Sequence, residues 1–296
     1  MTTPTTTRPS FTPTDRDRQI VSAVSAHRAL TSDQVALLFW GDIKANSRCR
    51  TRLRLLAQHG YLERLEQPVA LSEGRRPLVY FLARRGLALA AAERGVSEAA
   101  IEWKKEHNDV RWPFLDHLIA TNDVRVRLEL AAPVAGFTLL EWLDDKTLAS
   151  LSIRDQFTVP RPGGGTQQLA VGPDGYVSLL DPDGRTRHRA FIEADRGTVP
   201  LGRWQDKVRR YLLYFRSPAF AARYRASKPF RVLAVTTSDT RLGNMKAAAE
   251  EVGGQTWFWF STYAALSDPA DVLHRPTWFM AGRQEPVGFP YPLPEV

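Results

Sequence analysis

Apolar residues recur at helical spacing in three consecutive segments near the N-terminus. The segments begin at Thr14, at Thr31 and at about residue 46, and the third runs to residue 59. Thr14 and Thr31 are expected to be helix N-caps, because a threonine hydroxyl accepts a hydrogen bond from a free N–H of the first turn. Gln34, three residues after Thr31, completes a capping-box pattern. The spacing therefore predicts three successive helices, with Gly60 as the C-terminal cap of the third.

The third predicted helix has an apolar side and a basic side. Its apolar side carries Cys49, Leu53, Leu56 and Ala57. Its opposite side and flanks carry Arg48, Arg50, Thr51, Arg52, Arg54 and Gln58. If the apolar side packs on the two preceding helices, the arginines point outward, as in a recognition helix that enters the DNA major groove. Arginine can form paired hydrogen bonds to guanine or to phosphate, which favours DNA as the partner.

Two short apolar stretches follow, at residues 61–65 and 78–82, with a polar turn between them. Their alternation predicts a β-hairpin, and a further helix is expected from about residue 84 to residue 94. Three helices followed by a hairpin predict a winged helix-turn-helix. Arg75 and Arg76 at the tip of the wing are then expected to contact the DNA backbone or the minor groove.

The charge distribution supports this interpretation. The chain has 40 Lys and Arg against 32 Asp and Glu, a net charge of +8. Residues 41–90 hold ten Lys and Arg against four Asp and Glu, so this stretch contributes six of the eight excess charges. A local basic excess is typical of a DNA-binding surface. The alternative is a solvated charged helix in a winged helix that binds protein.

Strand and helix patterns alternate in the second half of the chain. The expected elements are a helix at 113–130, strands at 137–142, 169–180 and 189–194, a helix at 201–215, a strand at 230–236, a helix at 240–252 and a strand at 256–260. This order predicts an α/β domain with a mixed sheet. The aromatic run at 257–260 is expected to be a buried strand.

Three acidic residues are candidates for a metal site. Asp174 lies in a Pro-Asp-Gly bend, and Glu193 and Asp195 alternate at the end of the following strand. Alternation places Glu193 and Asp195 on one face, within reach of Asp174. Three carboxylates together are a ligand set for Mg²⁺ or Mn²⁺, and such an ion activates water for phosphodiester hydrolysis. The alternative, which stays open, is a turn aspartate and two acids paired with nearby arginines.

From about Thr14 to Phe260 the sequence resembles the replication-relaxation family of plasmids and integrative elements. The resemblance rests on the winged-helix start, on LDHLIATNDVRVRL with His117 and Asn122, and on Pro173-Asp174. Its most specific part is FIEADRGTVPLGRWQDKVRRYLLYF, in which the matching positions are Glu193, Asp195, Gly197, Thr198, Lys207 and Tyr211.

This resemblance implies a second domain similar to the PD-(D/E)XK nuclease fold of restriction endonucleases. The usual lysine two residues after the glutamate is replaced here by Asp195, and Lys207 on the next helix is expected to take its place. A surface role for Lys207 is the alternative. The implied function is DNA binding on a mobile element in support of plasmid replication or DNA relaxation, with metal-dependent nicking as a hypothesis. A catalytically inactive regulator, or an adaptor for a relaxase, replication protein or coupling protein, stays open.

The expected chain organisation has two domains. Cys49 is the only cysteine, and neither a signal peptide nor a membrane-length apolar run is evident, so a cytoplasmic protein without disulfides is expected. The expected partners are double-stranded DNA and a second copy of the chain. The expected segments are a tail at 1–13, the winged helix at 14–96, a connector at 97–112, the nuclease-like domain at 113–265 and a Pro-rich extension at 266–296.

Overall fold

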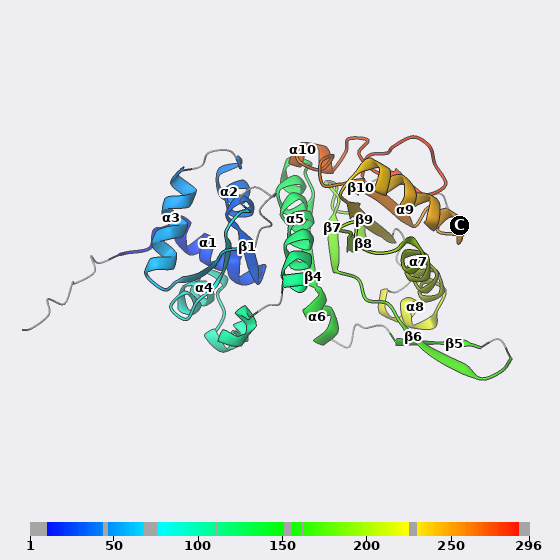
Figure 1. The fold of residues 1–296 in the computed structure, drawn as a ribbon, viewed down its shortest axis with the longest axis horizontal. Helices are drawn as coiled ribbons and strands as arrows, with labels where there is room; N and C mark the ends of the chain where they lie inside the picture. The colour runs from blue at the N-terminus through cyan, green and yellow to red at the C-terminus, as the bar shows by residue number, and fades with distance from the viewer. Residues whose placement is uncertain are drawn as a thin grey trace, which may run out of the picture. The chain divides into compact units, whose positions relative to one another are not determined.

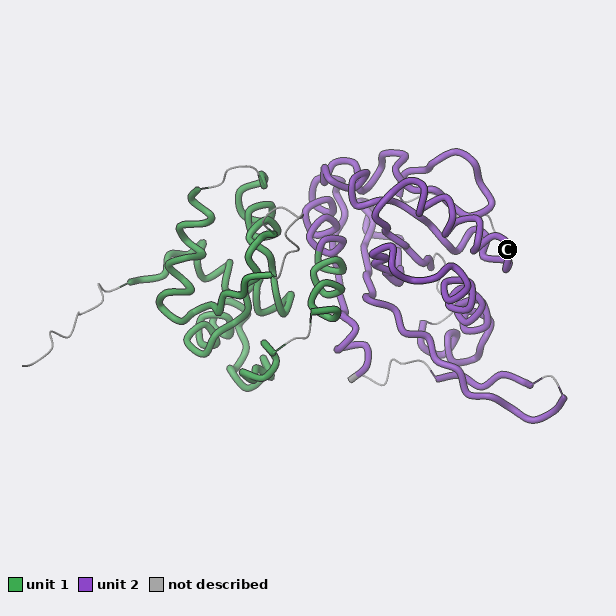
Figure 2. The backbone as a smooth tube through the Cα atoms, viewed as in Figure 1, with its two compact units in different colours: residues 1–122 green, residues 123–296 purple. Residues whose placement is uncertain are grey.

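A computed structural model describes most of the chain (Figure 1), namely residues 11–43, 47–67, 76–109, 112–150, 156–161, 163–224 and 230–289. The chain divides into two compact units, Met1–Asn122 and Asp123–Val296 (Figure 2). We call them unit 1 and unit 2 and describe each by itself. No helix in the described ranges combines the length and the apolar character that crossing a membrane requires.

Unit 1 contains helices and a small antiparallel sheet. Its elements are α1 (Asp15–Ala26), β1 (Ala29–Thr31), α2 (Ser32–Trp40), α3 (Ser47–Gln58), β2 (Leu62–Leu65), β3 (Val79–Leu82), α4 (Gly86–Arg94) and two 3-10 turns, η1 (Glu98–Ile101) and η2 (Lys105–Asn108). The strand order is β1-β3-β2, so β3 is central. The predicted helices and the predicted strand pair are confirmed, and β1 is an addition.

The helix ends of unit 1 follow the predicted local chemistry. Thr14 and Thr31 cap α1 and α2, and both form complete capping boxes, with Asp17 and Gln34 respectively. Gly60 follows α3 with a φ of 75°, a left-handed conformation in which glycine has no Cβ to clash. The sequence rules for helix boundaries are therefore confirmed at these positions.

The long helix α5 (Trp112–Val134) runs through the division between the units. Its first part packs in unit 1, where Leu115 and Leu118 join a core cluster with residues of β1 and β3. The Asn122 side chain donates to the backbone carbonyls of His27 and Ala29 at 3.0 and 2.7 Å. The division therefore lies inside the helix, between Asn122 and Asp123, whereas the expected second domain begins at residue 113.

Unit 2 is built on a six-stranded mixed sheet. Its elements are β4 (Thr138–Asp144), α6 (Asp145–Ser150), β5 (Gln156–Pro160), β6 (Thr166–Ala170), β7 (Gly175–Leu180), β8 (Arg187–Ala194), α7 (Leu201–Phe215), α8 (Pro218–Tyr224), β9 (Phe230–Thr236), α9 (Asp239–Glu251), β10 (Phe258–Thr262), α10 (Pro269–Val272) and β11 (Phe279–Met280). The strand order is β11-β10-β9-β8-β7-β4, and β8, β9 and β10 are parallel. The predicted mixed sheet is confirmed. Strands β5 and β6 form a separate hairpin.

Successive side chains of β8 enter two different cores. Phe191 packs in the cluster on the α7 and α9 side of the sheet, and Ile192 packs in the cluster on the other side. This alternation sends Glu193 to the same side as Phe191. Strand β10 is buried throughout, which confirms the prediction for Phe258, Trp259 and Phe260, whereas Trp257 lies before the strand and is half-buried. Residues beyond 265, expected to form an extension, contribute Trp278, Met280 and Phe289 to the second cluster.

Candidate functional sites

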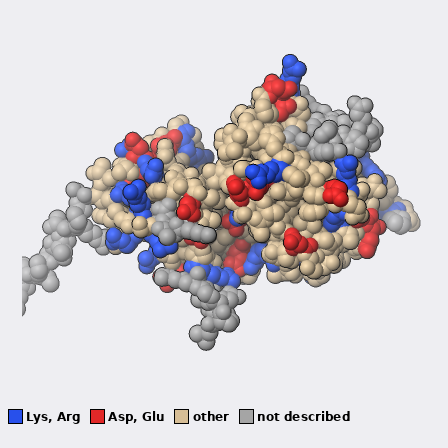
Figure 3. All heavy atoms as spheres, turned by 90° about the horizontal axis from the view of Figure 1, so that it is seen from above, with Lys and Arg blue, Asp and Glu red and all other residues tan. Residues whose placement is uncertain are grey.

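Helix α3 of unit 1 presents the basic surface that the sequence predicts. Cys49, Leu53 and Leu56 are buried. The exposed residues of α3 are Ser47, Arg48, Arg50, Thr51, Arg54 and Gln58. In the view of Figure 3, Lys and Arg side chains of unit 1 reach the surface, with Asp and Glu side chains among them. The predicted division of this helix into an apolar and a basic face is confirmed.

Arg52 differs from the other arginines of α3. Its guanidinium forms an ion pair with Asp17 of α1 through two hydrogen bonds, the longer of which is 2.9 Å between Nε and Oδ1. Burial would raise the pKa of Asp17, but the hydrogen bonds from Arg52 and Thr14 outweigh burial and lower this pKa. Arg52 is therefore engaged inside unit 1, joining α3 to α1.

The structure gives different information about the two arginines expected at the wing tip, Arg75 and Arg76. Strands β2 and β3 pair in register, with Leu62 opposite Leu82. Arg75 lies outside the described residues. Arg76 is described, and its Nη1 lies 3.5 Å from Oδ1 of Asp116 on α5. The structure therefore gives Arg76 an acidic partner within unit 1, and the geometry of the wing tip stays a prediction.

In unit 2, Glu193 is buried at the C-terminal end of β8, with 5% of its side chain exposed. Lys207 and Tyr211, one helical turn apart on α7, both donate hydrogen bonds to its carboxylate. Burial raises the pKa of Glu193 to about 7, and the Asp174 charge adds to this rise while Lys207 and Tyr211 oppose it. Burial would lower the pKa of Lys207, but the charges of Glu193 and Asp174 outweigh it and raise that pKa.

Asp174 lies beside this pair, just before β7. Its Oδ2 accepts the backbone N–H of Ala194 at 2.8 Å, and its own N–H donates to the carbonyl of Ile192 at 3.0 Å. These bonds hold the aspartate at the end of β8. The structure thus places Asp174, Glu193 and Lys207 close together, and Tyr211 joins them through its hydrogen bond to Glu193.

Asp195 is directed to a different partner. Its carboxylate accepts two hydrogen bonds from Arg241 of α9, at 3.0 Å from Nε and 3.1 Å from Nη2. It also accepts the Thr236 hydroxyl at 2.6 Å and the Gly197 N–H at 3.0 Å. The sequence alone does not identify Arg241 as a partner of Asp195. The sequence does place Arg241 in the first turn of the helix that follows β9, the strand beside β8.

The predicted metal ligand set does not form in this structure. Within the described ranges, no three His, Cys, Asp or Glu side chains are grouped so that they could hold a metal ion. Glu193 is neutralised by Lys207, and Asp195 is neutralised by Arg241. The residues present therefore do not fit the expected three-carboxylate site, and no chemical step through a metal ion follows from this geometry.

A second tyrosine approaches the acidic residues from the end of β10. The Tyr263 hydroxyl is buried, and it has no hydrogen-bond partner among the described residues. Burial raises its pKa strongly, and the charges of Asp123, Asp174 and Asp195 raise it further. The hydroxyl is therefore a neutral donor close to two of the predicted site acids, and no sequence motif indicated it.

These features define a two-unit protein with mixed α and β structure, a basic helix in one unit and a buried acid–lysine pair beside a mixed sheet in the other. The family model for replication-relaxation matches residues 22–227, and the chain belongs to this family. No curated protein matches the chain. The structure of restriction endonuclease FokI is matched with 9% sequence identity over 85% of this chain and 68% of the other, at a TM-score of 0.22. A similarity this low carries no argument about fold or function.

Proposed function

We propose that unit 1 is a winged helix-turn-helix that binds double-stranded DNA in support of plasmid replication or DNA relaxation. The observation that carries this proposal is the division of α3 into a buried apolar face and an exposed basic face. In this arrangement α3 enters the major groove and the β2–β3 hairpin is the wing. Membership of the replication-relaxation family supports the biological role.

The exposed arginines of α3 are available to a polyanion. Within the described part of the chain, Arg48, Arg50 and Arg54 have no carboxylate partner, and Arg54 only donates to Gln58 at 3.3 Å. An unpaired guanidinium can bind phosphate without first breaking an ion pair. Each phosphate contact also releases counterions, which makes the affinity fall as salt rises. Thr51 adds a hydroxyl donor on the same face.

The test compares two double variants by fluorescence anisotropy with a labelled duplex. Arg50→Ala with Arg54→Ala removes two charges from α3, and Arg84→Ala with Arg94→Ala removes two exposed charges elsewhere in unit 1. We expect the α3 variant to reduce the slope of log affinity against log salt by up to about two, or about 0.9 per lost contact. The control variant should keep most of the slope. Equal slopes in the two folded variants would contradict the proposal.

A second candidate function is phosphodiester cleavage at Asp174, Glu193 and Lys207. The observation in its favour is the buried Glu193 carboxylate, which has a pKa raised to about 7 and lies beside a lysine and a second acid. A group with a pKa near neutrality can accept or donate a proton under physiological conditions. The Lys207 ammonium would stabilise negative charge on a phosphate. The alternative to cleavage is a protein without catalytic activity, either a regulator or an adaptor that recruits a relaxase, replication protein or coupling protein.

Nicking of supercoiled plasmid distinguishes these candidates. Wild-type protein is incubated with plasmid in buffer alone, with Mg²⁺ and with Mn²⁺, and nicked circles are separated on a gel. We expect Glu193→Gln to abolish any nicking, while Glu285→Gln, an exposed control in unit 2, retains it. Equal nicking by both variants would exclude Glu193. Absence of nicking by the wild type under all three conditions would favour the regulator or adaptor.

A further inference from the structure

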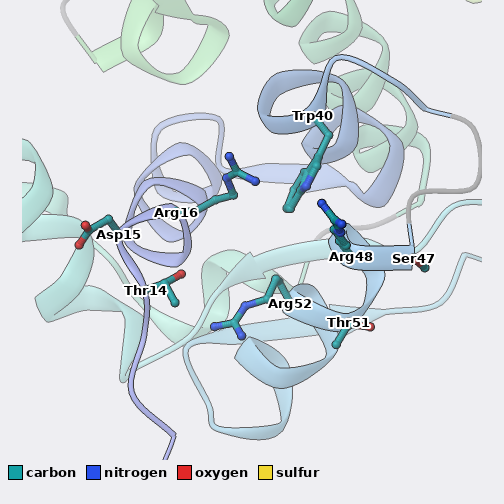
Figure 4. A pocket seen from close by; sticks show the side chains of 8 residues that line it. All are labelled: Thr14, Asp15, Arg16, Trp40, Ser47, Arg48, Thr51 and Arg52. Carbon is teal, nitrogen blue, oxygen red and sulfur yellow. The ribbon is translucent and has the colours of Figure 1, made fainter.

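A pocket of about 600 Å³ lies in unit 1 where α1, α2 and α3 meet. Arg16 lines it from the first turn of α1, Trp40 from the last residue of α2, and Ser47, Arg48 and Thr51 from α3 (Figure 4). Its volume lies in the range of small-molecule sites, which is about 300–1,000 Å³. The pocket is thus large enough for a ligand of more than a few atoms.

The charged groups of the pocket are mainly cationic. Within the described part of the chain, neither Arg16 nor Arg48 has a carboxylate partner. Asp15 also lines the pocket, but its side chain is 94% exposed and lies 3.9 Å from Arg18. Figure 4 shows it pointing away from Arg16. Two guanidinium groups without acidic partners favour an anion, and phosphate matches their planar donor geometry.

Trp40 supplies both an aromatic surface and a donor. The Arg16 guanidinium lies 5.1 Å from the centre of the indole ring. The indole N–H is buried and has no acceptor among the described residues. A buried donor without an acceptor is unfavourable, so an acceptor oxygen that reaches the indole N–H is favoured. The Ser47 and Thr51 hydroxyls are further neutral donors on the α3 side.

We propose that this pocket binds the phosphate group of a nucleotide, with Arg16 and Arg48 neutralising its charge and Trp40 contacting the attached sugar or base. The phosphate belongs either to the backbone of a DNA strand or to a free mononucleotide. The backbone case rests on the DNA binding proposed above, because the same helix α3 lines the pocket and carries the DNA-facing arginines. The mononucleotide case is independent of it.

The experiment measures both ligand sources with the full chain. Binding of 5′-dAMP and of inorganic phosphate is followed by calorimetry, and binding of a labelled duplex is followed by anisotropy at several salt concentrations. The variants are Arg16→Gln, which removes a pocket charge, and Trp40→Phe, which keeps a ring and removes the N–H. Arg94→Gln removes an exposed charge from α4 and is the matched control. Unchanged melting curves establish that each variant is folded.

Either of two results would support the proposal that the pocket binds a nucleotide phosphate. If dAMP binds the wild type and the control but binds Arg16→Gln and Trp40→Phe about tenfold more weakly, the equivalent of about 1.4 kcal/mol, the ligand is a free nucleotide. If dAMP does not bind, but the Arg16→Gln variant binds duplex about tenfold more weakly with a salt slope reduced by about one, the ligand is a backbone phosphate. Variants that match Arg94→Gln in both assays would overturn the proposal.

The outcomes also separate this inference from the proposed function. Arg50 and Arg54 do not line the pocket. If their double variant binds duplex normally while Arg16→Gln loses dAMP, the recognition-helix proposal fails and the pocket stands. If the double variant loses duplex binding while Arg16→Gln behaves like its control in both assays, the pocket fails and the recognition helix stands.

Discussion

Arg241 holds Asp195 through two parallel hydrogen bonds, with distances of 3.0 and 3.1 Å. The pair joins the first turn of α9 to the residue after β8. A two-point contact fixes the orientation of a carboxylate as well as its charge. Arg241 also donates to the carbonyl of Val199, so it connects the loop before α7 to the same point. This contact explains why Asp195 is separate from the Glu193 site although the two residues alternate along the chain.

Replacing Arg241 should destabilise unit 2. Arg241→Ala leaves the Asp195 carboxylate buried without its cation, which costs about 3 kcal/mol in the free energy of unfolding. Urea unfolding monitored by fluorescence measures the loss. Arg275→Ala is the control, because Arg275 is 65% exposed in a surface pair with Asp271 and should contribute less than about 1 kcal/mol. Equal effects of the two variants would contradict a structural role for Arg241.

Glu193 should make the stability of the protein depend on pH. Its pKa is about 7 when folded against an ordinary value of 4.5, so between these values the unfolded chain loses the proton while the folded chain keeps it. Stability therefore falls as pH rises from about 4.5 through 7, by up to about 3 kcal/mol in total, and this contribution levels off once the folded carboxyl is fully ionised above pH 7.

The measurement compares urea unfolding of the wild type and of Glu193→Gln at pH 5, 6 and 7. Glutamine does not titrate, so the difference between the two proteins isolates the carboxyl group. We expect the wild type to lose stability relative to the variant as pH rises. A difference that stays constant across this range, or changes in the opposite direction, would show that Glu193 titrates normally.

Lys207 should control the response to divalent cations. In the wild type, the Lys207 ammonium already neutralises Glu193, so Mn²⁺ is expected to leave the melting temperature nearly unchanged. Lys207→Ala leaves Glu193 and Asp174 close together without a cation, and a divalent ion that binds the folded state should then raise the melting temperature. Thermal melting at pH 8 with and without Mn²⁺ measures this response. The prediction fails if wild-type melting rises with Mn²⁺ as much as that of the variant.

Arg52 and Arg50 should separate stability from DNA affinity. Arg52→Ala leaves the buried Asp17 carboxylate unpaired and should lower the stability of unit 1 by about 2 kcal/mol. Arg50 is exposed, so Arg50→Ala should leave stability within about 0.5 kcal/mol and weaken duplex binding. Thermal melting and anisotropy on both variants provide the measurement. If Arg50→Ala lowers the melting temperature as much as Arg52→Ala does, the two arginines do not have separate roles.

Local sequence patterns predicted much of unit 1. Thr14 and Thr31 cap their helices because a capping box depends only on a residue three positions away. The two faces of α3 follow from helical periodicity in the same way. The sequence placed Arg52 on a flank of the basic face, and its partner Asp17 is 35 residues distant, so no local pattern indicated the ion pair.

The candidate site of unit 2 also depends on a partner that is distant in the sequence and that no local pattern indicates. Alternation along β8 predicted that Glu193 and Asp195 share a direction, and the family motif added Lys207. The pattern could not show which acid receives which cation, since Arg241 follows Asp195 by 46 residues and comes from another helix. The assumption that three nearby acids form one site therefore fails at Asp195, where a long-range partner competes for the carboxylate.

The core of unit 2 depends on residues late in the chain. Trp278, Met280 and Phe289 pack with Ile192 and Trp259, and β11 is an edge strand of the sheet. During synthesis these residues leave the ribosome long after unit 1 is complete. Unit 1 can therefore fold while the chain is still growing, whereas unit 2 exposes an unfilled apolar surface until the segment up to Phe289 has emerged.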